Sequence, residues 1–153
     1  MSPNGQAYLS NPDRPEGLAR FAQARIAPPT STHKTIYVSG TACVRPDGTW
    51  EGVTENEDGT YTLDIRKQTA AVLSNIDAIV KGASGGKGGV RNVIDAVVYI
   101  LDMKADYAGM NEEWNKVFPN RESAPARATI GVKELPDPRM IVEVKAVAVV
   151  EVW

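Results

Sequence analysis

The chain has 153 residues, a formal net charge of −2 and one cysteine, Cys43. This length predicts a single domain. The mild acidity, without clustered Lys and Arg, argues against a nucleic-acid-binding surface. One cysteine excludes a disulfide within the chain and favours a reducing compartment. We therefore expect a cytoplasmic protein, with no apolar run long enough for a membrane span.

The first part of the chain differs in character from the rest. Residues 1–34 are rich in proline and show little periodicity, so we expect an irregular N-terminal arm, with a helical turn near residues 17–25. Residues 35–153 are expected to form the folded domain. Glycine-containing turn signals at residues 46–48 and 56–59 separate short β-rich runs at its start.

Two segments are predicted to be helices. Residues 64–81 place apolar side chains on one stripe at helical spacing, with Asp64 as N-cap and Gly82 as the stop. Residues 104–118 form a second amphipathic segment, which Pro119 ends. The stripe of the first helix comprises Ile65, Val72, Leu73, Ile76, Ile79 and Val80.

The other elements are predicted to be strands. Residues 94–101 are apolar on both faces, as expected of a central strand, and two apolar strands joined by a proline-rich turn follow at 126–132 and 141–148. This order predicts an α+β fold, with two helices packed on one face of a mixed sheet. Because the last strand is apolar on both faces, we expect the other face to be covered by a second subunit in a closed oligomer.

Each of the two C-terminal strands carries one charged residue among apolar neighbours. Arg127 opens the first strand and Glu143 lies inside the second. Charges in such places are paired or functional. The two residues are either a structural ion pair or a site where arginine grips a carboxylate and a nearby glutamate handles a water molecule. His33 is the only histidine, so no metal cluster or histidine triad is expected.

The C-terminal motifs resemble those of the reactive intermediate deaminases, also called the RidA or YjgF family. Further matches lie in both predicted helices, and the resemblance covers roughly residues 35–150. The matching segments are Pro125–Val132, Leu135–Pro136, Val142–Ala148, Gln68, Leu73, Asn75, Ile76, Asp102–Met103, Tyr107, Met110–Glu112 and Phe118.

The resemblance implies a chorismate-mutase-like fold in a homotrimer, with ligand sites in the clefts between subunits; whether trimers pair into hexamers stays open. It implies hydrolysis of 2-enamine or 2-imine acids to 2-oxo acids and ammonia, without metal or cofactor. Arg127 would bind the substrate carboxylate, helped by the backbone N–H of Thr129. Glu143 would position the attacking water.

A finer resemblance points to the branch that contains 2-aminomuconate deaminase. It rests on Val38–Thr41, Arg45–Thr49 and Thr62–Thr69. It implies hydrolysis of a dicarboxylate enamine, 2-aminomuconate, to 4-oxalocrotonate and ammonia in aromatic-compound or tryptophan catabolism.

Four more residues are candidates for substrate binding. A dicarboxylate needs a second cation, and Arg25 is the candidate, although a surface role in the arm is equally compatible with its position. Ser39 and the backbone of Gly40 are candidates for the amine side, with Ser39 otherwise a strand-end hydrogen bonder. Asn111 is a candidate near the site entrance.

Two alternatives to 2-aminomuconate deaminase stay open at this point. One is a general 2-imine acid deaminase, and the other is a non-catalytic trimer that binds 2-oxo acids. The presence of Glu143 argues against the binding module, because binding alone does not need a carboxylate that handles water. A substrate panel separates the two enzymes.

Overall fold

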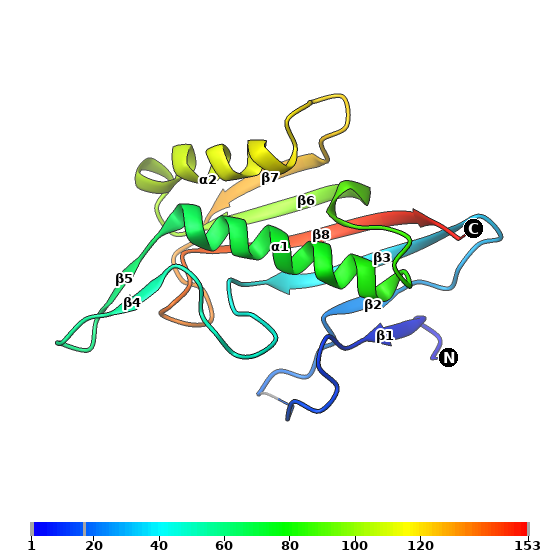
Figure 1. The fold of residues 1–153 in the computed structure, drawn as a ribbon, viewed down its shortest axis with the longest axis horizontal. Coiled ribbons are helices and arrows are strands. Elements are labelled where there is room, and N and C mark those ends of the chain that lie inside the picture. Colours follow the sequence, from blue (N-terminus) through cyan, green and yellow to red (C-terminus); the bar gives the residue numbers. More distant parts are fainter. Residues whose placement is uncertain (1, 17, 153) are drawn as a thin grey trace.

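A computed structural model describes residues 2–16 and 18–152, and within these residues the chain forms a six-stranded sheet and a separate two-stranded one (Figure 1). In the large sheet, β6 and β7 run parallel and all other neighbours run antiparallel. Its strands, in sheet order, are β1 (Gln6–Tyr8), β2 (Ala24–Ile26), β3 (His33–Thr41), β8 (Val142–Glu151), β6 (Val93–Ile100) and β7 (Ala126–Gly131).

The two predicted helices are confirmed. They are α1 (Ile65–Ala83) and α2 (Met103–Val117), and both lie on the same face of the sheet (Figure 1). Each starts at an aspartate whose side chain accepts a backbone hydrogen bond, Asp64 from Lys67 N and Asp102 from Ala105 N, both at 3.0 Å. The α+β class, with two helices covering one face of a mixed sheet, is therefore confirmed.

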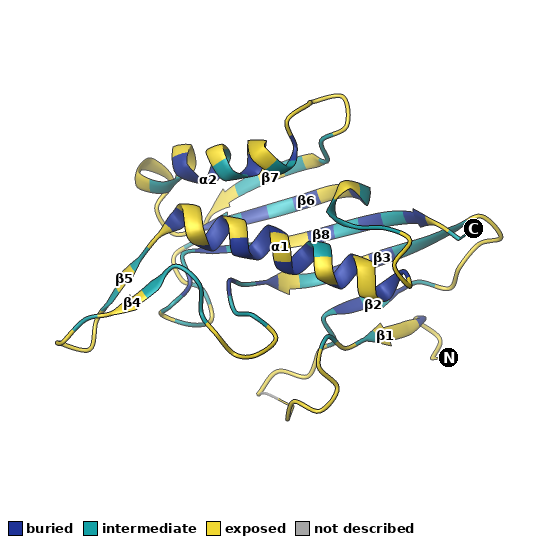
Figure 2. Cartoon of the chain, viewed as in Figure 1, coloured by how far each residue is buried: buried dark blue, intermediate teal, exposed yellow. Residues whose placement is uncertain are grey.

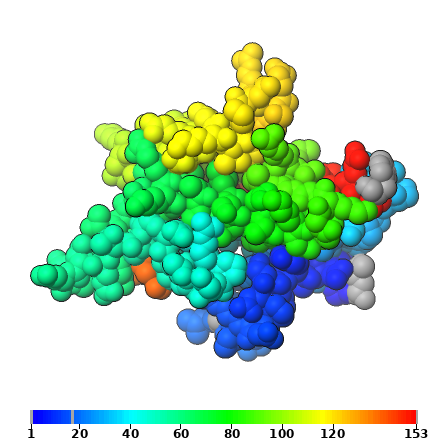
Figure 3. Space-filling view, in the orientation of Figure 1, coloured from blue at the N-terminus to red at the C-terminus, as the bar shows by residue number. Residues whose placement is uncertain are grey.

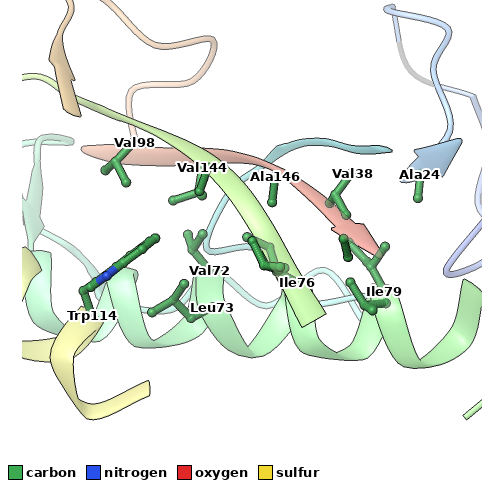
Figure 4. Packing of buried hydrophobic residues seen from close by; sticks show 14 of the residues in the cluster. Ala24, Val38, Val72, Leu73, Ile76, Ile79, Val98, Trp114, Val144 and Ala146 are labelled. Carbon is green, nitrogen blue, oxygen red and sulfur yellow. The ribbon is translucent and has the colours of Figure 1, made fainter. Parts of the chain in front are cut away.

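The core lies between α1 and the sheet. Figure 2 shows the inward stripe of α1 buried and its outward face exposed. The apolar stripe expected from the sequence packs against alternate residues of β3, β6 and β8 (Figure 4). Residues at helical spacing on α1 and every second residue of the strands therefore form one buried layer. The labelled contact layer comprises Val72, Leu73, Ile76, Ile79, Val38, Val98, Val144 and Ala146.

The N-terminal arm corrects one expectation. Residues 1–34 were expected to be irregular, but β1 and β2 extend the sheet, and residues 18–25 form no helical turn. Position 17, where that turn was expected to start, lies outside the described residues. The hydroxyl of Tyr8 packs so closely on Gly82 in α1 that a Cβ there would collide with it. The arm is thereby attached to the helix layer as well as to the sheet.

The two C-terminal strands are not neighbours, although they follow each other in the chain. The strand β6 lies between β7, which is at the sheet edge, and β8, which is central. The parallel pairing of β6 with β7 is made possible by α2, which connects them as a crossover helix. This arrangement decides which face of the sheet each functional side chain reaches.

The sheet face opposite the helices is uncovered by any described element; we call it the open face. Along β8 the buried valines and alanines point to the helices, and the alternate residues lie on the open face. Tyr37 on β3, which pairs with Val147, is 46% exposed there. The residues of β8 on the open face are Glu143, Lys145, Val147, Val149 and Glu151.

The two-stranded sheet is a hairpin of β4 (Val53–Glu55) and β5 (Tyr61–Leu63), built on the turn predicted at residues 56–59. In the space-filling view it projects from the body of the molecule (Figure 3). A short 3-10 helix, Val90–Asn92, precedes β6. Among the described residues, no helix is long and apolar enough to cross a bilayer.

Candidate active site

Glu143 is the second residue of β8 and lies on the open face, opposite Tyr99 of β6. Its side chain is half-buried, and no described residue forms a hydrogen bond or ion pair with its carboxylate. Burial therefore raises the pKa of Glu143 above the ordinary glutamate value, with no neighbouring cation to oppose the shift. A carboxyl of this kind can accept a proton from water and return it.

Gly40 fits directly against this carboxylate. A Cβ at position 40 would lie 2.9 Å from both Cδ and Oε1 of Glu143, which is closer than side-chain carbons approach such atoms. The approach occurs where the pairing of β3 with β8 shifts register between Val38 and Thr41. The absence of a side chain at Gly40 therefore leaves the room that the carboxylate occupies.

Ser39, predicted to face the substrate amine or to bond at the strand end, forms local hydrogen bonds. Its Oγ donates to the carbonyl of Ala22 at 2.7 Å, and its N–H donates to the carbonyl of Gln23 at 2.9 Å. Both partners belong to the arm. In this chain Ser39 ties the arm to β3 beside Gly40, so it supports the wall of the site.

Arg127 lies on the helix side of the sheet. Its guanidinium is 4.9 Å from the ring centroid of Trp114, and Nη1 is 3.8 Å from Sδ of Met110; both partners are in α2. These are a cation–π contact and a weak contact to sulfur. No carboxylate among residues 2–16 and 18–152 forms an ion pair with Arg127, so its charge is available to an anion.

The structure does not bring Arg127 and Glu143 together within one chain. Arg127 is in register with Ala96 of β6, and Glu143 with Tyr99. Those two positions of β6 are separated by three residues, so they face opposite sides of the sheet. A structural ion pair between Arg127 and Glu143 is likewise absent from the described chain.

Of two further predicted residues, Thr129 accompanies Arg127 and Asn111 lies in a helix. Thr129 is in register with Val98, so its side chain shares the helix side with Arg127, and its strand β7 is an edge strand with β6 as its neighbour. Asn111 is in α2, directly after Met110. The predicted residues of the sheet thus form two groups: Arg127 and Thr129 on β7, and Gly40 and Glu143 on the open face.

Arg25 belongs to neither group. It pairs with Tyr37, which places it on the open face, but Tyr37 pairs with Val147, four residues along β8 from Glu143. That separation is about 13 Å along the strand. Arg25 Nε donates to the carbonyl of Asn4 at 3.1 Å, and its Nη2 donates to Ser2 and Asn4. Within one chain Arg25 therefore holds the first residues of the arm.

The single cysteine and the potential metal ligands give no further candidate site among the described residues. Burial raises the pKa of the Cys43 thiol to about 11, so the reactive thiolate is scarce at neutral pH. No group of three or more potential metal ligands occurs among the described residues. Sequence reasoning overlooked Lys145 and Tyr99, which share the open face with Glu143. The two-residue period of β8 was the available signal for Lys145, whereas only the pairing of strands identifies Tyr99.

Comparison with known proteins assigns the chain to a family. The family model described as Endoribonuclease L-PSP matches residues 12–150, so the chain belongs to that family, the RidA/YjgF family that its motifs resemble. It is 27% identical over 128 residues to a "RutC family protein" of Aquifex aeolicus, which covers 84% of this chain and 87% of that protein.

Two further relatives cover nearly the whole chain. A "2-iminobutanoate/2-iminopropanoate deaminase" of Dermatophagoides farinae is 27% identical over 151 residues, covering 99% of this chain and all of that protein. The crystal structure of yeast Mmf1 superposes with a TM-score of 0.68 at 24% identity, covering 94% of this chain and 97% of that chain. The second likeness supports the fold.

Proposed function

We propose that this protein is a deaminase that hydrolyses 2-enamine and 2-imine acids to 2-oxo acids and ammonia. The observation that carries the proposal is the carboxylate of Glu143, which is half-buried, without a cation and fitted against Gly40. The family membership and the similarity to an imine deaminase over the whole chain support the reaction class.

The chemistry needs one general base and one anion-binding group. Water attacks the imine carbon while Glu143 takes its proton, and the protonated Glu143 then gives a proton to the nitrogen. This gives a carbinolamine. Glu143 then moves the proton of the carbinolamine hydroxyl group to the nitrogen, so the C–N bond breaks, ammonia leaves and a C=O bond remains. An enamine first tautomerises to the imine. Arg127 pairs with the substrate carboxylate through its planar guanidinium, which fixes the imine carbon near the base.

We further propose that each site is shared between two subunits. Within one chain, Arg127 and Glu143 lie on opposite sides of the sheet, so a substrate that touches both must bridge two copies. A homotrimer, in which the open faces pack together and each β7 edge meets a neighbouring subunit, satisfies this requirement. The uncovered Tyr37 and Val147 supply apolar surface for that packing.

The finer candidate, 2-aminomuconate, stays within this proposal as one substrate to be tested. A dicarboxylate needs a second cation, and the candidate, Arg25, bonds to the first residues of the arm and lies far along the sheet from Glu143. The general imine deaminase needs Arg127 and Glu143 alone. We therefore favour the general reaction over specificity for 2-aminomuconate.

The deciding experiment is a substrate panel with three proteins: wild type, Arg127→Ala and Glu143→Gln. We expect the wild type to accelerate release of ammonia from imines generated by an amino-acid oxidase. Arg127→Ala should raise KM most, and Glu143→Gln should lower kcat most. Binding of 2-oxo acids without turnover by the wild type would instead establish the binding module. Enzymatically generated 2-aminomuconate, followed by its ultraviolet absorbance, belongs in the same panel.

The family description names a ribonuclease, and this activity is the second function to test. The chain has a net charge of −2 and a single histidine, a combination that gives RNA no basic surface. We expect no RNA cleavage above that of the Glu143→Gln variant. Cleavage lost in that variant would contradict this expectation.

A further inference from the structure

Lys145 lies on the same face of β8 as Glu143, two residues further along the strand. Side chains two residues apart on a strand share a face, with their Cα atoms about 7 Å apart. The buried valines and alanines of β8 alternate with these two charged residues, so both side chains leave the sheet on the open face. One subunit therefore presents a carboxylate and an ammonium group on one surface.

The ammonium group of Lys145 is directed toward β3. Its Nζ donates to the carbonyl of Val38 at 3.2 Å, two residues before Gly40, which touches the Glu143 carboxylate. On the other side, β6 places Asp95 opposite Val147 rather than opposite Lys145. No ion pair joins Lys145 to an acidic side chain among the residues that the structure describes.

The charge of Lys145 is thus satisfied by a single neutral carbonyl. Exchanging that carbonyl for a carboxylate oxygen replaces a neutral acceptor by a charged one, so the ammonium group gains the attraction of an opposite charge. Within one chain the side chain is exposed, and its long stem is flexible, so it can leave Val38 without opening the core of the subunit. Lys145 is therefore able to act on a bound anion.

We propose that Lys145 binds a second carboxylate of the substrate, so that the enzyme prefers 2-imino dicarboxylates, the imines of acidic amino acids. This inference rests on the proposed deaminase function. The carboxylate next to the imine pairs with Arg127, the imine carbon lies at Glu143, and the distal carboxylate reaches Lys145. The spacing of about 7 Å between the Cα atoms of Glu143 and Lys145 suits an acid whose two carboxylates are separated by two or three carbons.

The test compares 2-iminoglutarate with 2-iminobutanoate, each generated by an amino-acid oxidase and followed by formation of the oxo acid in competition with semicarbazide. We expect the wild type to favour 2-iminoglutarate. Lys145→Met should lower kcat/KM for 2-iminoglutarate about tenfold and leave that for 2-iminobutanoate unchanged. Lys145→Arg should keep the preference. Lys67→Met, which removes one charge from the exposed face of α1, is the matched control.

Ionic strength provides a second readout, because added salt weakens the attraction between an ammonium group and a carboxylate. Raising the ionic strength should reduce the wild-type preference and have little effect on the ratio in Lys145→Met. Equal losses for both substrates in Lys145→Met, or no loss for either, would overturn the role of Lys145 while leaving the deaminase intact. Turnover of neither imine by the wild type would overturn the deaminase function itself, and the two failures are thereby distinguishable.

Discussion

At the scale of single residues, Glu143 combines two properties that oppose each other. Burial raises its pKa, which suits a group that must take a proton from water and return it. The same burial disfavours the ionised carboxylate in the folded protein relative to the unfolded chain. We therefore expect this residue to serve the reaction at the expense of stability.

The substitution Glu143→Gln should reveal this opposition. Because the pKa of Glu143 is higher in the folded state, the folded protein holds that proton more tightly, and its stability falls as pH rises through the folded pKa. Glutamine stays neutral. We expect the variant to have a higher Tm than the wild type at neutral pH, no advantage below pH about 4, and no turnover.

The measurement is the Tm of wild type and variant by thermal unfolding, from acidic to neutral pH. Glu151→Gln is the control, since Glu151 is an exposed carboxylate on the same face of β8. An equal gain at acidic and neutral pH in Glu143→Gln would show that the effect does not come from ionisation.

Gly40→Ala tests the close approach at the site. The new Cβ would lie 2.9 Å from the carboxylate of Glu143, so the carboxylate must turn away from its position. We expect kcat to fall about tenfold or more, as for other misplaced general bases, with a small change in Tm. Gly131→Ala is the control, because a Cβ there meets only Met103, at an ordinary 3.7 Å. Equal activity in both variants would contradict the role of Gly40.

At the scale of elements, the helices were predictable and the short strands were not. The apolar stripe and the aspartate caps are local signals, and α1 and α2 follow them closely. The strands β1 and β2 have three residues each, too few to show alternation, so the arm looked irregular. The site was harder still, because the placement of β6 between β7 and β8 depends on pairing between distant segments.

The helix α1 also holds the segment that leads into the site strand. Gln68 is completely buried; its Nε2 donates to the carbonyl of Arg139 at 2.7 Å, and its Oε1 accepts from the N–H of Ile141 at 3.1 Å. These bonds fix the chain immediately before β8 starts at Val142. The position of Glu143 thus depends on a polar contact from the helix layer.

We expect Gln68→Met to lower the free energy of unfolding by about 1–3 kcal/mol, because backbone groups of Arg139 and Ile141 lose their partners inside the protein. Urea unfolding measures this loss, and hydrogen exchange should show faster exchange at Ile141. Gln6→Met, at an exposed position of β1, is the control. Unchanged exchange at Ile141 would mean that Gln68 does not anchor this segment.

At the scale of the whole molecule, a site shared between subunits predicts how much activity returns in oligomers that contain two different impaired variants. At a substrate concentration below the wild-type KM, Arg127→Ala and Glu143→Gln subunits should each have little activity alone. When they are co-expressed, a site that takes Arg127 from one subunit and Glu143 from its neighbour is intact in about a quarter of cases. Kinetics on the purified mixed oligomer measure the recovered fraction. No recovery in a mixed oligomer would contradict sharing.

The central place of β8 has a consequence for how the chain folds during synthesis. It is the last strand in chain order, yet β3 and β6 pair with each other only through it. Until β8 has left the ribosome, the sheet consists of two disconnected halves, and the apolar stripe of α1 has an incomplete surface to cover. Such a nascent chain exposes strand edges that favour aggregation. We therefore expect the sheet to be completed late, once β8 has been synthesised.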